Sequence, residues 1–311
     1  MEGRLYLHIG PPKSGTTSLQ LAFDKINHPQ FVYGGVYQPR DRNAGSLANR
    51  LHQGLKEQES RLLQGVAEEV RSLVAQGNQV MISEEMLLLT QGPKKWRKKL
   101  DDMRELFNDI PTTVIISLRD PLEGVPSLYQ EIFSGLPLRY KINFSRFCES
   151  DIASCYDFDC VQKELSVIGY DDIRFLSFDG IRKGNISSAD LLGENDILKI
   201  SQIPIGHANA GDKKANANQR KVAGVTLKNL GQLPPVRWAI ERFGLRSAPW
   251  YRHFVNRLDV VSLRRAGYRN LTVPADSAER FSAGYRDAMA EITEKRISLN
   301  PTTDIAQSEG H

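Results

Sequence analysis

The ten residues from His8 to Thr17, which read HIGPPKSGTT, constrain the fold of this chain more than any other feature. They follow a short apolar run at residues 4–9 and precede a segment, 19–26, whose apolar residues keep helical spacing. A turn of small residues between a strand and a helix leaves several backbone N–H groups without partners, and the helix dipole favours negative charge there. The sequence therefore predicts a strand, an anion-binding loop and a helix.

The position of the lysine indicates which anion the loop binds. In the loop that binds nucleoside triphosphates, G-x-x-x-x-G-K-[ST], the lysine follows the second glycine and reaches the β- and γ-phosphates. Here Gly10 and Gly15 have this separation, but Thr16 stands where that lysine would be and Lys13 precedes Gly15. A lysine followed by hydroxyls suits a 5′-phosphate that carries one transferable group. The alternative to an anion-binding loop is an ordinary glycine-containing turn between a strand and a helix. The expected anion-binding residues are Lys13, Ser14, Gly15, Thr16, Thr17 and Ser18.

A second motif follows the most strand-like run in the chain, at residues 112–118. Asp120 is a good N-cap residue and Pro121 suits the first helical position, so a helix should start directly after this strand. We then expect Arg119 at the carboxyl edge of the sheet and Ser127 about two turns into the helix. Arginine binds phosphate oxygens through a planar fork of donors, and a serine hydroxyl can add one more. The alternative for Arg119 is a helix-capping or surface ion pair.

At these two motifs the chain resembles the sulfotransferases that use 3′-phosphoadenosine 5′-phosphosulfate (PAPS). Their 5′-phosphosulfate loop has a Pro-Lys-[ST]-Gly-[ST]-[ST] turn between a strand and a helix, and their 3′-phosphate site has an arginine at a strand end and a serine eight residues later. The resemblance implies that residues 13–18 hold the 5′-phosphosulfate and that Arg119 and Ser127 bind the 3′-phosphate. It also implies that PAPS is the co-substrate and that a sulfuryl group passes to an acceptor hydroxyl.

Two other functions stay open beside this one. A P-loop nucleotide kinase would need a lysine where Thr16 stands. A non-catalytic nucleotide-binding module is expected to lack Lys13 or the base, and Lys13 is present.

Transfer of a sulfuryl group asks for electrostatic stabilisation and for a general base. Lys13 is expected to stabilise the negative charge that develops on the leaving oxygen. An acceptor hydroxyl must lose a proton, and Ser83-Glu84-Glu85 ends an expected strand beside the loop. Only one of two adjacent strand residues can face the site. We expect Glu85, which aligns with a glutamate of the similar bacterial sulfotransferases, to be the base, with Glu84 and His52 as alternatives.

Strand-like runs alternate with helical stretches over the first 180 residues or so, which is typical of a parallel sheet with helices on both faces. Ligands of such sheets bind beyond the carboxyl ends of the strands, where both motifs fall. We therefore predict an α/β fold with a P-loop-like parallel sheet flanked by helices. The expected strands are 4–9, 31–36, 79–83, 112–118 and 172–178, and the expected helices are 15–26, 60–76, 95–108, 121–134 and 158–169.

From about residue 206 the chain loses its strand-like runs and becomes helical and basic. We expect residues 1–205 to form the PAPS-binding core and 206–299 to form a helical region of the same domain, on the acceptor side or as a lid. A terminal helix is expected at 275–296, and residues 300–311 are expected to be a disordered tail. Lys213, Lys214 and Arg220 are further candidates for the 3′-phosphate, although they lack the glycine pattern of the family.

The net charge of +4 is too small to imply nucleic acid, but the charge is unevenly spread. Residues 94–99 form one basic cluster, and residues 237–269 hold eight arginines against Glu241 and Asp259. Each cluster is either a solvated helix face or a surface for an acidic acceptor, a polysaccharide or anionic lipid. We expect a hydroxyl-bearing acceptor, of carbohydrate, lipid or small-molecule type, and no nucleic-acid partner, with peripheral membrane contact left open.

The sequence has no apolar run long enough to span a membrane and no signal-peptide pattern, so we expect a cytoplasmic protein. Cys148, Cys155 and Cys160 match no zinc-binding spacing. We expect reduced thiols and no metal site.

Overall fold

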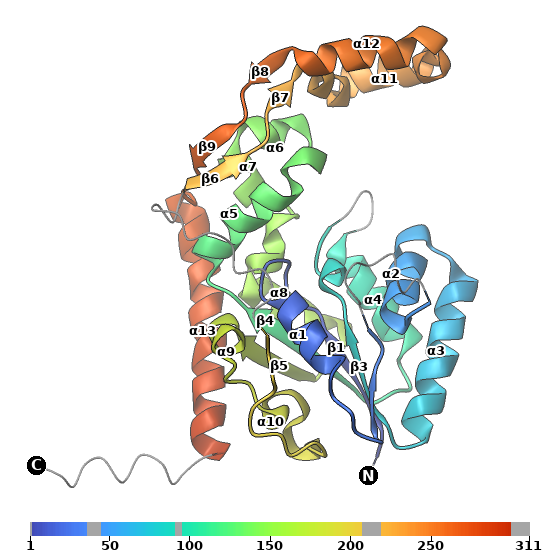
Figure 1. Ribbon diagram of the computed structural model, residues 1–311, viewed down its shortest axis with the longest axis vertical. Coiled ribbons are helices and arrows are strands. Elements are labelled where there is room, and N and C mark those ends of the chain that lie inside the picture. Colours follow the sequence, from blue (N-terminus) through green and yellow to red (C-terminus); the bar gives the residue numbers. More distant parts are fainter. Residues whose placement is uncertain (1, 36–44, 91–94, 207–218, 300–311) are drawn as a thin grey trace, which may run out of the picture. The chain divides into compact units, whose positions relative to one another are not determined.

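The computed structural model describes residues 2–35, 45–90, 95–206 and 219–299 (Figure 1). By their internal contacts these residues divide into two units. The first holds the described residues up to 121, those from 155 to 206 and those from 280 to 299, and the second holds 122–154 and 219–279. The sequence prediction instead separated the chain at residues 205/206. The predicted tail at 300–311 lies outside the described residues.

The first unit is built on a five-stranded sheet in which every neighbouring pair is parallel, in the order β2-β3-β1-β4-β5 (Figure 1). All five residues of β3 and six of the seven residues of β4 are buried, as expected when helices cover both faces of a parallel sheet. The strands are β1 (Arg4–His8), β2 (Phe31–Tyr33), β3 (Gln79–Ser83), β4 (Thr112–Leu118) and β5 (Asp172–Ser177).

Helices pack on both faces of this sheet, which confirms the predicted α/β fold. On one face, Leu19 and Phe23 join Tyr6, Met81 and Ile115 in the core. On the other face α3 contacts β1 and β3, and α4 contacts α3 and α8. The helices of the first unit are α1 (Thr16–Phe23), α2 (Leu47–Glu57), α3 (Ser60–Ala75), α4 (Trp96–Leu106), α8 (Phe158–Ile168), α9 (Phe178–Lys183), α10 (Ser188–Leu192) and α13 (Ala275–Leu299), the last beginning in the second unit.

Two local features of the first unit differ from the sequence prediction. The helix α2 was not expected, yet Leu47, Leu51 and Leu55 repeat every four residues and are all buried. The strand β2 ends at Tyr33, three residues earlier than predicted, and two glycines follow it. Glycine weakens a strand because it has no side chain to pack.

The second unit contains an aromatic cluster and two short antiparallel strand pairs. The Tyr129 ring lies 4.9–5.3 Å from the rings of Phe133, Phe144 and Phe147. The helices are α5 (Pro121–Ile132), which begins in the first unit, α6 (Leu138–Ile142), α7 (Phe144–Cys148), α11 (Pro234–Arg242) and α12 (Pro249–Val260). The strands are β6 (Gln219–Val222), β7 (Val225–Thr226), β8 (Ser262–Arg264) and β9 (Gly267–Asn270), with β6 paired to β9 and β7 to β8.

The expectation that strands end before residue 206 is therefore wrong. Strands of two to four residues with arginine, lysine and serine side chains carry no apolar alternation that a sequence pattern could reveal. The terminal helix, in contrast, is present as α13, three residues longer than predicted. None of the helices in the described part of the chain combines the length and the apolar character needed to cross a bilayer.

Candidate functional site

The loop after β1 and the residue after β4 meet beyond the carboxyl ends of these two neighbouring strands. These two strands are neighbours, but the chain leaves β1 toward β2 at one edge and leaves β4 toward β5 at the other. The connections therefore diverge beyond the carboxyl ends of β1 and β4. In open α/β sheets this divergence forms the crevice in which ligands bind.

The backbone of the loop between β1 and α1 is unusual. Lys13 has φ 72° and Gly15 has φ 86°, so both lie in the left-handed region. This conformation costs a residue with a side chain roughly 1–2 kcal/mol, and such cost is typically found at functional sites. Gly10 is required by close packing, because a Cβ there would lie 2.8 Å from Cβ of Ser117. Turns of this kind bring successive backbone N–H groups together into an anion-binding concavity.

Three successive carbonyl groups of this loop accept hydrogen bonds from side chains. The Ser14 hydroxyl donates to Pro11 O at 2.6 Å, and the Tyr156 hydroxyl donates to Pro12 O at 2.6 Å. Arg119 Nη1 donates to Lys13 O at 2.7 Å. Burial raises the pKa of Tyr156, so its hydroxyl keeps the proton that it donates. Because protein donors engage these three carbonyl oxygens, which would otherwise repel an anion, the bonds hold the loop in this conformation.

Arg119 is held from two sides. Besides its bond to Lys13, the guanidinium carbon lies 4.9 Å from the centre of the Phe178 ring, a cation–π distance. Phe178 directly follows β5 and is the first residue of α9. A guanidinium has five N–H donors, so the bond to Lys13 is compatible with a further anionic acceptor. Ser127, the other predicted 3′-phosphate residue, lies half-buried on α5 in the second unit, and its role stays a prediction.

The two glutamates after β3 have different surroundings. Glu84 is fully buried, and its carboxylate accepts the Met86 N–H at 2.8 Å, which caps the short 3₁₀ turn Glu85–Leu87. Glu85 instead reaches the loop, where its carboxylate accepts the Thr16 hydroxyl at 2.5 Å. The structure therefore brings Glu85 and Arg119 to the same loop, Glu85 at the Thr16 hydroxyl and Arg119 at the Lys13 carbonyl, whereas the catalytic and binding roles of these residues stay predictions. His52 is half-buried on α2.

The turn that carries Glu85 is supported from inside by a lysine. Lys99 is 1% exposed, and its Nζ donates to the carbonyl oxygens of Met86 and Leu89 at 2.8 Å each. Lys99 belongs to the basic cluster at 94–99, of which Lys94 lies outside the described residues. Lys99 is thus a buried support of the turn and contributes no exposed charge.

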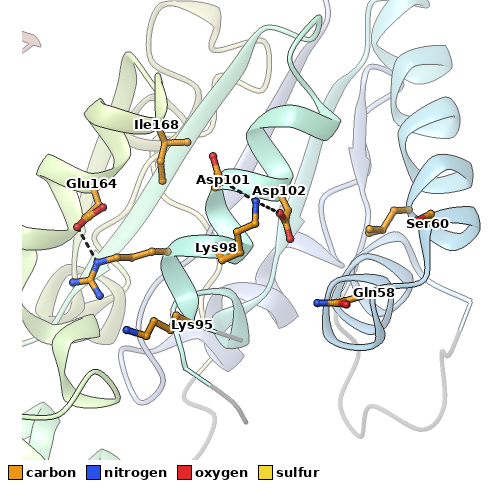
Figure 2. Close-up of a pocket in the computed structure, with 10 residues that line it drawn as sticks. Gln58, Ser60, Lys95, Lys98, Asp101, Asp102, Glu164 and Ile168 are labelled. Carbon is orange, nitrogen blue, oxygen red and sulfur yellow. Dashed lines mark hydrogen bonds and ion pairs between the residues drawn. The ribbon is translucent and has the colours of Figure 1, made fainter. Parts of the chain in front are cut away.

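The neighbouring cations line a surface pocket of mixed charge (Figure 2). Arg97 pairs with Glu164 at 2.8 Å, and Lys98 pairs with Asp101 and Asp102 at 2.8 Å each. The described residues that line this pocket come from α3, α4, α8 and the residues next to α2 and α4, and the predicted site residues are not among them. The local carboxylates therefore offset much of this cluster's positive charge.

A histidine lies between the ends of three strands at this edge. The His8 Nδ1 and Ser83 Oγ are 2.7 Å apart, and His8 Nε2 and Ser117 Oγ are also 2.7 Å apart. His8 is fully buried, and burial lowers its pKa from 6.5 to about 4. The imidazole is therefore neutral near pH 7 and serves as a hydrogen-bonding link between β3, β1 and β4. The three cysteines are free thiols, with Cys148 and Cys155 buried.

Three residues that support the loop or the turn beside it were not predicted from the sequence. Phe178 could have been found, because it follows β5 and so falls at the same sheet edge as the motifs. Tyr156 ends the 3₁₀ turn Ala153–Tyr156 and follows no strand, so no such signal exists for it. Lys99 was not singled out, because it lies in a run of lysines and arginines that indicates an exposed surface. The other predicted cations, Lys213 and Lys214, lie outside the described residues.

Comparison with known proteins gave matches among solved structures alone. No protein-family model and no curated protein matches the chain. A sulfotransferase from Alicyclobacillus acidocaldarius is 13% identical, with 81% of this chain and 95% of that chain covered and a TM-score of 0.38. The sulfotransferase domain of the Synechococcus PCC 7002 olefin synthase is 15% identical, with 64% and 74% covered and a TM-score of 0.35.

Proposed function

We propose that this chain is a PAPS-dependent sulfotransferase that moves a sulfuryl group from PAPS to an acceptor hydroxyl. The observation that carries the proposal is the hydrogen bond from Arg119 to the Lys13 carbonyl. It joins the loop expected to hold a 5′-phosphosulfate to the residue expected to bind a 3′-phosphate, at the divergence of the chain beyond β1 and β4. A donor with anionic groups at both its 5′ and 3′ positions suits this pairing.

In the proposed reaction each residue has a distinct task. The backbone N–H groups of residues 14–18, with the hydroxyls of Thr17 and Ser18, bind the 5′-phosphate at the N-terminus of α1. The bond between sulfur and the phosphate oxygen breaks as a bond from sulfur to the acceptor oxygen forms, and Lys13 stabilises the negative charge on the leaving oxygen. Glu85 takes the proton of the acceptor hydroxyl, and adenosine 3′,5′-bisphosphate leaves. Arg119, with Ser127, binds the 3′-phosphate.

The two alternative functions predict different ligands and products. A kinase binds ATP and transfers its γ-phosphate, whereas a binding module retains the bisphosphate and transfers nothing. Calorimetry with PAPS, adenosine 3′,5′-bisphosphate and ATP should give tighter binding for the two 3′-phosphorylated nucleotides. A transfer assay with ³⁵S-labelled PAPS and an array of sugar, lipid and phenol hydroxyls should then label at least one acceptor, and Lys13→Ala should serve as the inactive control. Tighter binding of ATP would contradict the proposal.

A further inference from the structure

The second unit carries a segment that lacks a core of its own. Residues 227–270, which we call the arm, comprise two 3₁₀ turns, Leu227–Gln232 and Leu245–Ser247, together with α11, α12, β8 and β9 (Figure 1). Among the described side chains of the arm none is buried. Helices of 9 and 12 residues are marginal in water alone, and most helices in proteins are stabilised by packing an apolar face. We therefore expect another surface to cover the arm.

Four large aromatic side chains of the arm are exposed. Trp238 is 62% exposed, Phe243 69%, Trp250 54% and Phe254 49%. Single exposed apolar residues are ordinary, but several large ones on one segment mark an interaction site. Trp250 and Phe254 also contact each other, with ring centres 6.0 Å apart.

The helix α12 shows how these side chains are arranged. Tyr251, Val255 and Leu258 form one half-buried stripe, and α12 contacts the Leu227–Gln232 turn. Trp250 and Phe254 are exposed and start a second stripe, which Arg257 continues one turn further along. The exposed stripe thus combines aromatic rings with a cation.

The charge of the arm indicates what covers it. The arm holds eight arginines and one lysine against Glu241 and Asp259. The Glu241 carboxylate pairs with two arginines, with nitrogen–oxygen distances of 2.9 Å to Arg237 and 4.0 Å to Arg246. Six described arginines of the arm are exposed, namely Arg237, Arg242, Arg246, Arg257, Arg264 and Arg265. Positive charge therefore surrounds the exposed aromatic rings.

We propose that the arm binds the surface of an anionic membrane. Interfacial helices combine Trp, Phe and Leu with Lys and Arg, bury the apolar groups at the boundary between headgroups and acyl chains, and meet lipid phosphates with the cations. A second copy of the chain would bring the same positive charge to the contact, which disfavours self-association through the arm. A soluble anionic polysaccharide would satisfy the arginines but leave Phe243 and Phe254 in water. The proposal is independent of the sulfotransferase chemistry.

The tryptophans of the full-length chain provide a direct readout of this binding. Of the three, Trp238 and Trp250 lie exposed in the arm and Trp96 is fully buried in the first unit. Vesicles of phosphatidylglycerol should bind the chain in a flotation assay and shift the tryptophan emission to shorter wavelength, and brominated acyl chains should quench it. Phosphatidylcholine vesicles should do neither. The variant Trp238→Phe/Trp250→Phe should still bind these vesicles but show no emission shift, because Trp96 alone remains.

Substitutions separate the two parts of the surface. Trp250→Ala/Phe254→Ala should lower the vesicle partition coefficient at least tenfold, and each of Arg242→Ala and Arg257→Ala should lower it about fivefold. The matched controls are Val167→Ala and Arg61→Ala, because both residues are exposed in the first unit. Neither control should change the partition. Far-UV circular dichroism checks that each variant keeps its helices.

Four results would overturn the proposal. The first is equal binding to anionic and neutral vesicles. The second is binding to heparin with no flotation of vesicles. The third is a lipid-free dimer, seen by sedimentation, that already shows the emission shift. The fourth is a wild-type partition coefficient in the folded arm variants.

Discussion

Arg119 Nη1 donates a hydrogen bond of 2.7 Å to the backbone oxygen of Lys13, and these residues are 106 positions apart in the chain. The bond joins the end of β4 to a loop whose conformation is strained at Lys13, with φ 72°. Arg119 is therefore expected to act in two ways, by holding the loop and by binding a ligand, and these two contributions can be measured separately.

Replacing Arg119 with alanine should weaken binding of adenosine 3′,5′-bisphosphate by roughly 1.5–3 kcal/mol, the range for a hydrogen bond to a charged group. The same calorimetry with adenosine 5′-phosphate, which lacks the 3′-phosphate, measures the loss of affinity that comes from the disturbed loop alone. If Arg119 binds the 3′-phosphate, the variant loses selectivity between the two nucleotides. Equal affinities of the wild-type protein for both nucleotides would show that the 3′-phosphate assignment is wrong.

Lys13→Ala and Lys13→Gly should both lower kcat by roughly 10²–10³-fold, because each removes the cation expected at the leaving oxygen. Their stabilities should differ, since glycine adopts a positive φ without the strain that alanine retains. We expect Lys13→Gly to be about 1 kcal/mol more stable than Lys13→Ala in urea unfolding. If either variant kept the wild-type turnover rate, Lys13 would have no role in the reaction.

Glu85→Gln keeps the size of the side chain and removes the basic oxygen, so PAPS binding should persist while turnover falls by roughly 10²–10⁴-fold. Glu84→Gln should mainly lower stability, because Glu84 is buried and caps the turn after β3. His52→Asn should change turnover least. The base assignment fails if His52→Asn abolishes transfer while Glu85→Gln remains active in the same single-turnover assay.

The buried imidazole of His8 predicts a loss of stability in mild acid. Its pKa is about 4 in the folded chain, against 6.5 for an ordinary exposed histidine, so between these values the unfolded chain binds a proton that the folded chain does not. Stability is therefore highest above pH 6.5 and falls as the pH drops toward 4. From pH 7 to pH 5 the loss should be about 2 kcal/mol.

Urea unfolding of the wild-type chain and of His8→Gln at both pH values isolates this contribution. The variant should be less stable at pH 7, because a glutamine does not reproduce both bonds to Ser83 and Ser117. Its change in unfolding free energy between pH 7 and pH 5 should be smaller by about 2 kcal/mol. Identical pH dependence of the two proteins would mean that His8 titrates alike in the folded and unfolded chain.

The fold of the first unit was largely predictable, because its strands β3 and β4 are buried almost throughout and so read as apolar runs. The limits of β3 and β4 agree with the sequence prediction to the residue. The strands β6 to β9 were not predictable, since their side chains are mostly polar and their pairing is carried by the backbone. Patterns of apolar residues report burial, and these strands have little of it.

The same distinction separates the parts of the candidate site. Lys13 and Arg119 lie in local motifs that follow strands, so their meeting at one sheet edge follows from topology. The hydrogen bond from Tyr156 to Pro12 O spans 144 positions and depends on tertiary packing that no local pattern encodes. Lys99 shows a related limit, because a lysine in a run of cations indicates a surface, and only the two carbonyl groups it meets explain its burial.

The link formed by Ser83, His8 and Ser117 also bears on how the sheet is assembled. Apolar residues such as Leu7, Ile82 and Ile116 pack without directional bonds. A strand displaced along its neighbour would therefore still bury an apolar side chain. A displacement by one residue would turn a serine to the opposite face of the sheet and leave an imidazole nitrogen of His8 buried without its bond. This uncharged triplet thus penalises a slip of β3 or β4 against β1, and it keeps in register the strand ends from which the loops with Lys13, Glu85 and Arg119 emerge.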